Sequence, residues 1–88
     1  MKRYLAFFGE QYYPSQGMGD FVNDADTIDE AKLFIIGSAK RELDVRYYDT
    51  FDELWNMRWG CIYDTELRQT IELFDSSNFG ELEVMQLQ

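Results

Sequence analysis

The 88-residue sequence contains no histidine, one cysteine, one proline, and only eight basic residues against seventeen acidic ones. Without histidine, the chain lacks the side chain most often used for proton transfer near neutral pH. A single cysteine, Cys61, excludes an internal disulfide and a thiolate cluster for zinc. We therefore expect a protein that is not an enzyme and that uses no metal and no cofactor.

Long apolar runs are also missing. No stretch of about 18 apolar residues occurs that could form a membrane-spanning helix. The opening MKRYLAFFGEQ (1–11) has too short a hydrophobic segment for a signal peptide. We expect a soluble, cytoplasmic protein that does not bind membranes.

The net charge is −9. Nucleic-acid binding needs lysine and arginine to displace the counterions of the phosphates, so we do not expect this chain to bind DNA or RNA directly. Two interpretations stay open. The charge either maintains solubility alone or matches a basic partner protein.

What the sequence does contain is enough apolar material for one small core. The apolar fraction is 45%, and seven Phe, six Tyr and two Trp supply large side chains with few rotors to freeze. A chain of this length has no room for two cores, so residues 1–88 should form a single domain.

The main helix is predicted over 27–42. Thr27 and Glu30 have the capping-box spacing, which satisfies two free amides at a helix start. At 100° per residue one face collects the apolar residues Ile28, Ala31, Ile35 and Ala39. Leu33 and Phe34 fall outside this stripe.

The other elements follow from alternation and from a second capping box, Thr50 with Glu53. Strands are predicted at 2–8, 43–48, 58–64 and 69–74, and a short helix at 51–57; the last eight residues are predicted as an edge strand, with a helix as the alternative. The fold class is α+β. We expect a small, mostly antiparallel sheet of three to five strands, one main helix packed across it and a second short helix.

The stretch from Gly9 to Asp26 is long for a structureless loop in a compact domain. Either it is functional, or FFGEQYY pairs with DFVND in a hairpin around PSQGMG. Tyr12 and Tyr13 are candidate contact residues, because tyrosine presents one apolar and one polar end. The alternative is that Tyr12 packs under the fold together with Met18 and Phe21.

Acidic residues gather just after this loop, at Asp20, Asp24, Asp26, Asp29 and Glu30. The spacing does not fit a calcium loop, because the third ligand position is Ile28 and the required glycine is missing. Asp29 and Glu30 suit the first turn of a helix, where the dipole favours anions. The five residues form either a solvated segment or a contact patch for a basic partner.

Trp59, Cys61 and Tyr63 alternate onto one side of the predicted strand 58–64. Cys61 should be buried and inert, since no base stands beside it in the sequence. If Trp59 and Tyr63 face solvent, they become candidate contact residues as well.

The segments YLAFFGEQYYPSQGMGDF (4–21), DTIDEAK (26–32) and WGCIYDTE (59–66) resemble small, mostly uncharacterised acidic proteins encoded by bacteriophages and prophages. In these, an opening strand runs into a YYP-and-glycine loop, a D-T-x-x-E-A helix start follows, and a W-x-x-I-x-D-T-E hairpin lies near the end. The turn DTELRQ, which lacks glycine, and the tail after Phe74 depart from this pattern.

Many proteins of this kind disable a host factor, so the resemblance implies a non-enzymatic inhibitor of the anti-CRISPR or related anti-defence type, acting in the host cytoplasm. Its partner would be a basic host protein that handles nucleic acid. The expected partner-binding residues are Tyr12, Tyr13, Asp20, Asp24, Asp26, Asp29 and Glu30. The alternative is a structural or regulatory module that self-associates as a homodimer, through an edge strand and the off-stripe Leu33 and Phe34.

Overall fold

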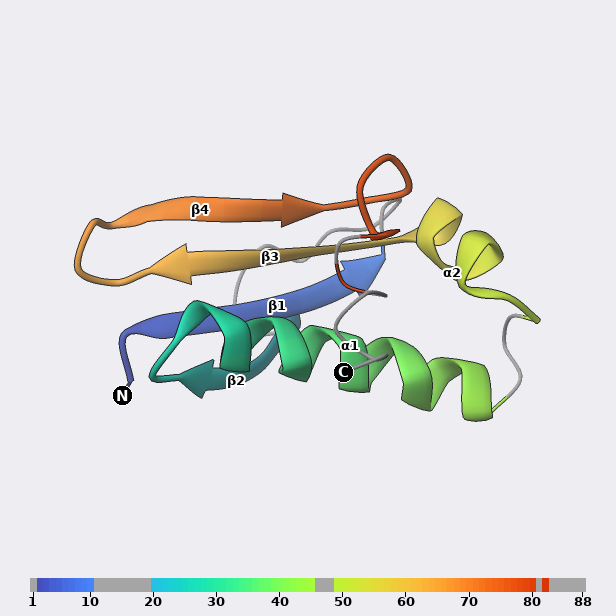
Figure 1. The fold of residues 1–88 in the computed structure, drawn as a ribbon, viewed down its shortest axis with the longest axis horizontal. Helices are drawn as coiled ribbons and strands as arrows, with labels where there is room; N and C mark the ends of the chain where they lie inside the picture. Colours follow the sequence, from blue (N-terminus) through green and yellow to red (C-terminus); the bar gives the residue numbers. More distant parts are fainter. Residues whose placement is uncertain (1, 11–19, 46–48, 81, 83–88) are drawn as a thin grey trace.

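The structure is a computed structural model, and it describes residues 2–10, 20–45, 49–80 and 82. Two helices and four strands follow one another along the chain (Figure 1). They are β1 (Tyr4–Glu10), β2 (Phe21–Ala25), α1 (Ile28–Asp44), α2 (Phe51–Met57), β3 (Arg58–Asp64) and β4 (Gln69–Phe74).

The four strands form one antiparallel sheet in the order β2-β1-β3-β4. Helix α1 lies along one face of this sheet, and α2 stands beyond the end at which β3 begins (Figure 1). The predicted α+β class, with one main helix packed across a small antiparallel sheet and a second short helix, is confirmed.

Both helices begin where the capping-box spacing predicted. The Thr27 Oγ1 accepts a hydrogen bond from the Glu30 amide at 3.1 Å, and the Thr50 Oγ1 accepts one from the Glu53 amide at 3.2 Å. Each threonine has extended backbone angles, as an N-cap requires. The Glu53 side chain accepts from the amide of Asp49, one residue before the cap. Local sequence therefore fixes both helix starts.

The core lies between α1 and the sheet. Small residues line both sides of this contact, since Ala31 and Ala39 of α1 and Ala6 and Ala25 of the strands are fully buried. At Gly60 of β3, a Cβ atom would lie 3.1 Å from the Ile35 Cγ2 and 3.3 Å from the Phe7 carbonyl oxygen. These positions let the helix approach the sheet closely.

A second part of the core surrounds Trp55, which is 1% exposed. Its ring meets Phe8 edge to face at a centroid distance of 5.6 Å and stacks on Phe79 at 6.0 Å. Phe8 belongs to β1 and Phe79 follows β4, so the indole joins α2 to both ends of the chain. Such aromatic pairs contribute roughly 0.5–1.5 kcal/mol each beyond the area they bury.

The hairpin alternative for the first loop is confirmed in part: the two flanking segments pair as antiparallel strands, but residues 21–25 pair with residues 4–7, so among the described residues of FFGEQYY only Phe7 has a partner in β2. β1 and β2 run antiparallel with Tyr4 opposite Ala25 and Leu5 opposite Asp24, and the register shifts at Ala6/Phe7. The Phe7 and Phe21 rings lie 5.8 Å apart on the face away from α1. The segment from Gly9 to Asp26 is therefore not a structureless loop throughout.

The strand predicted at 43–48 is wrong in its described part. Leu43 and Asp44 form the end of α1, and Val45 caps it by donating its amide to the Arg41 carbonyl at 3.2 Å. Residues 46–48 lie outside the described residues. The alternation of Leu43 and Val45 misled because Leu43 also continues the helical core stripe, where it packs against the buried cluster.

The predicted C-terminal edge strand falls mostly outside the described residues. Its one described residue, Leu82, is helical and 2% exposed, and its amide donates to the Phe79 carbonyl at 2.9 Å. The strand prediction is therefore wrong at Leu82. Along the part of the chain that the structure describes, no helix is long and apolar enough to cross a membrane.

Two glycines give a matched test of the packing. A Cβ at Gly37 of α1 would meet nothing within 4 Å, so Gly37→Ala should raise the free energy of unfolding by roughly 0.5–1 kcal/mol. Gly60→Ala should lower it, because the added methyl group crowds Ile35 and the Phe7 carbonyl. Urea unfolding of both variants measures the two effects, and shifts of the same sign would contradict this description.

Candidate partner-binding surface

The fold gathers three of the predicted acidic residues around one lysine. The backbone amide of Lys2 donates to the Asp24 Oδ2 at 2.7 Å, and its Nζ lies 3.6 Å from the carboxylates of both Asp26 and Glu30. Asp24 comes from β2, Asp26 from the turn, and Glu30 from the first turn of α1. We call Lys2, Asp24, Asp26 and Glu30 the Lys2 cluster.

The charges of the Lys2 cluster do not cancel, because it contains one ammonium and three carboxylates. The Asp26 and Glu30 carboxylates raise the pKa of Lys2 above its ordinary value, and the hydrogen bond from the Lys2 amide lowers the pKa of Asp24. Asp29 lies exposed in the same first turn of α1. This end of the molecule therefore carries a net negative surface, whose charge Lys2 neutralises in part.

Asp20 does not belong to this surface. It lies beside the other end of β1, where a Cβ on Gly9 would come within 2.6 Å of its carboxyl group. The negative charge of Asp20 also contributes to raising the pKa of Cys61 in β3. Tyr12 and Tyr13, the two predicted aromatic contact residues, lie outside the described residues. The structure thus brings together four of the seven predicted residues, namely Asp24, Asp26, Asp29 and Glu30.

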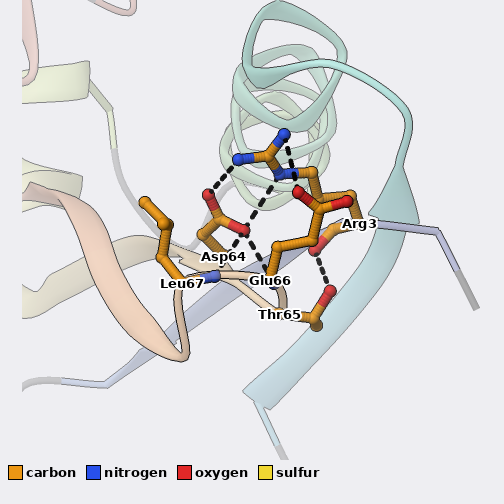
Figure 2. Close-up of polar contacts among 5 residues, drawn as sticks. All are labelled: Arg3, Asp64, Thr65, Glu66 and Leu67. Atoms are coloured by element: carbon orange, nitrogen blue, oxygen red, sulfur yellow. Dashed lines mark hydrogen bonds and ion pairs between the residues drawn. The ribbon is translucent and has the colours of Figure 1, made fainter.

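Next to the Lys2 cluster, Arg3 is held by a buried carboxylate that the sequence analysis did not single out (Figure 2). Asp64, 1% exposed, accepts from the Arg3 Nε at 3.0 Å and from its second guanidinium nitrogen at 2.9 Å. It also accepts from the amides of Glu66 and Leu67. Arg3 in turn contacts the Glu66 carboxylate at 3.1 Å. A planar guanidinium suits such a two-pronged pair.

This network fastens the start of β1 to the turn between β3 and β4. The Thr65 hydroxyl donates to the Arg3 carbonyl at 2.7 Å (Figure 2), and the Thr65 amide donates to the same carbonyl at 3.0 Å. The Arg3 guanidinium and the turn amides hold the pKa of Asp64 below its usual range. Both oxygens of the Asp64 carboxylate already accept hydrogen bonds within the fold, so the role of Asp64 is structural. It holds Arg3 in place, and with it the adjacent residue Lys2.

The aromatic residues of β3 point to the sheet face opposite α1. Trp59, Cys61 and Tyr63 are each half-buried there, so they are neither core residues nor a fully open contact surface. Burial, with a smaller contribution from Asp20, raises the pKa of the Cys61 thiol to about 11. Cys61 was predicted to be buried and inert; it is half-buried, and the raised pKa favours low reactivity.

In the described part of the chain, no group of three or more histidine, cysteine or acidic side chains is placed to bind a metal ion. In the Lys2 cluster the ammonium lies 3.6 Å from the carboxylates of Asp26 and Glu30, and the Asp24 carboxylate accepts from the Lys2 backbone amide. What this arrangement offers is charge and hydrogen-bond acceptors at the surface.

The Asp64 pair gives a pH-dependent prediction. Its folded pKa is lowered, so the stabilisation is fully present above the unfolded pKa of about 3.9 and is lost as pH falls through the folded value. Asp64→Asn should lower the melting temperature at pH 7, and the gap to the unmodified protein should narrow as pH falls below about 4. Asp44→Asn, at an exposed position, is the control and should change the free energy of unfolding by less than about 0.5 kcal/mol. A gap that is constant down to low pH would contradict this role of the carboxylate.

Cys61 gives a second prediction. With a pKa of about 11, only about one thiol in a thousand is ionised at pH 8, because each pH unit below the pKa reduces the thiolate tenfold. A disulfide-exchange reagent should therefore react with the folded protein on the order of a hundredfold more slowly than with the urea-unfolded chain. Equal rates would mean that the thiol is open and unperturbed.

Comparison with known protein families gives a match over most of the chain. The model of a protein family described as "Bacteriophage T4 protein Y07C" matches residues 4–83. No curated protein and no solved structure matches the chain. The matched stretch contains all four strands, both helices and the acids of the Lys2 cluster, and it begins after Lys2 and Arg3. The chain belongs to this bacteriophage protein family.

Proposed function

We propose that this phage protein is a non-enzymatic inhibitor that binds a basic host protein, namely a nucleic-acid-handling defence effector such as a CRISPR nuclease. The observation that carries the proposal is the convergence of Asp24, Asp26, Asp29 and Glu30 at one end of the fold, where Lys2 is the only base in the cluster. The family supports the phage origin. The nature of the target is our inference from charge.

In the proposed mechanism, carboxylates of the inhibitor take the place of the phosphates of nucleic acid. A protein that holds nucleic acid presents lysine and arginine side chains to phosphate groups. Carboxylates held at a surface can occupy the same positions and exclude the nucleic acid. A net charge of −9 also steers the inhibitor toward such a target, which raises the association rate more than the final affinity.

The Lys2 cluster is suited to this use because its acids are anchored. The Lys2 amide fixes Asp24, and the helix start, capped by Thr27, places Asp29 and Glu30. The Arg3–Asp64 pair holds the neighbouring end of β1. An acidic surface that is already ordered loses less side-chain entropy on binding than a free acidic tail does.

The test compares two variants of equal charge. The first, Asp24→Asn/Asp26→Asn/Asp29→Asn/Glu30→Gln, removes the acids at the proposed surface. The second, Asp44→Asn/Asp49→Asn/Asp52→Asn/Glu72→Gln, removes four acids from other parts of the molecule. Both change the net charge from −9 to about −5, so a difference between them reports position and not total charge.

Two measurements use this pair. In bacteria carrying an active CRISPR system, expression of the unmodified protein and of the second variant should restore plating of a targeted phage, and the first variant should not. Capture of host proteins from lysate should show the same pattern and weaken steeply with added salt. Equal protection by both variants would remove the Lys2 cluster from the mechanism. An absence of protection against every nucleic-acid-targeting defence would contradict the proposed function.

A further inference from the structure

The outer face of α1 carries an exposed leucine beside a glycine. Leu33 is 52% exposed, although it lies in the middle of the main helix. At Gly37, one turn later, a Cβ would meet no atom within 4 Å among the described residues outside the nearby backbone of its own helix. The core-facing residues Ala31, Ile35 and Ala39 lie on the opposite side at about 100° per residue, so Leu33 and Gly37 point away from the sheet.

Charged residues flank these two positions in a definite order. Asp29 and Glu30 lie in the first turn of α1, before Leu33, and Lys40 and Arg41 follow Gly37. Asp29, Lys40 and Arg41 are exposed. Along the outer face the sequence therefore runs from acid through leucine and glycine to base.

In a second copy of α1 that runs antiparallel to the first, this order is reversed, so bases of one copy would lie opposite acids of the other. A two-fold axis that crosses α1 at the level of Ile35 would place a second copy of the helix antiparallel to the first. With 1.5 Å per residue, Leu33 then lies level with Gly37 of the second copy, and Asp29 and Glu30 lie at the level of Lys40 and Arg41 of the second copy. At about 100° per residue, Asp29 falls on the same side of the contact as Lys40 of the second copy, and Glu30 on the side of Arg41.

We propose that the outer face of α1 binds a second copy of this chain in an antiparallel, two-fold symmetric dimer. Leu33 of each copy lies over Gly37 of the other, where the missing side chain allows the backbones to approach. Two Asp29–Lys40 pairs set the antiparallel direction. This dimer contact goes beyond the proposed inhibitor function. Asp29 belongs to both proposed surfaces, whereas Lys40 belongs only to the dimer contact.

The β4 edge of the sheet is a less suitable contact for a second copy. Leu73 of β4 is 57% exposed, but the ladder between β3 and β4 is irregular next to Glu72. An antiparallel pair of β4 strands would also bring two Glu72 side chains close together at its centre. Bulges and charges of this kind protect edge strands against pairing.

The proposed dimer is weak. Helix α1, of 17 residues, is about 25 Å long, so a contact between two such helices falls below the roughly 1,200 Å² of a standard stable interface. At the ends Asp44 approaches Asp26 of the second copy, which Lys2 neutralises only in part. We expect a dissociation constant between about 10 μM and 1 mM.

Sedimentation equilibrium from about 20 μM to about 1 mM tests the proposal. The unmodified protein should pass from monomer to dimer, and Leu33→Asp should stay monomeric. Gly37→Met should weaken the dimer at least about tenfold, because the new side chain occupies the place of Leu33 from the second copy. Circular dichroism should show that both variants remain folded, since neither position packs in the core.

Charge exchange at one pair provides the sharpest test. Asp29→Lys or Lys40→Asp alone should weaken the dimer about five- to thirtyfold, since each places like charges together twice. The double variant Asp29→Lys/Lys40→Asp should restore it. Asp29→Lys lowers the net negative charge, so a dimer governed only by overall repulsion would instead become tighter.

Asp52→Lys and Arg68→Asp, which change charge at exposed positions outside α1, serve as controls and should leave the specific contact intact. Three results would overturn the proposal. They are a monomer up to about 1 mM, a dimer that tolerates Leu33→Asp, and a double variant that fails to regain the affinity lost by the single ones. A dimer abolished by Leu73→Asp would place the contact at the sheet edge.

Discussion

The close contact between α1 and the sheet is the constraint on which the other features depend. It is made of small residues on both sides, with Ala31 and Ala39 on the helix and Ala6, Ala25 and Gly60 on the strands. Larger residues at these positions would hold the helix away from the sheet and open voids around Ile35 and Ile62. The contact fixes the rotation of α1, and therefore also which side chains face outward and which acids reach Lys2.

Carboxylates play distinct roles in this acidic protein according to their surroundings. Asp64 is buried and engaged by Arg3 and two backbone amides, so it contributes to folding and offers no free acceptor to a partner. Asp24, Asp26 and Glu30 all contact Lys2 at the surface, and because one lysine neutralises only one of the three charges, the group keeps a net negative charge. The total of seventeen acids therefore says little until each is placed.

Sequence patterns predicted the parts of the fold that depend on local interactions. The two capping boxes gave both helix starts, because Thr27 and Thr50 satisfy amides only three residues away. The hairpin of β3 and β4 followed from alternation on each side of a short turn. The end of α1 was wrong because Leu43 fits both a strand and a helix pattern, and only its packing against the core decides between them. Asp64 escaped notice because its partner, Arg3, lies 61 residues away.

The sequence by itself determined that the chain is acidic, that it lacks histidine and cysteine pairs, and that it forms two capped helices and a hairpin. These properties depend on composition or on residues a few positions apart. Only the tertiary structure decided that Asp24, Asp26 and Glu30 meet at Lys2 and Asp20 does not, and that Leu33 and Gly37 face outward. Those facts depend on strand register and on the rotation of α1, which are set by long-range burial of apolar surface and have no local signal in the chain.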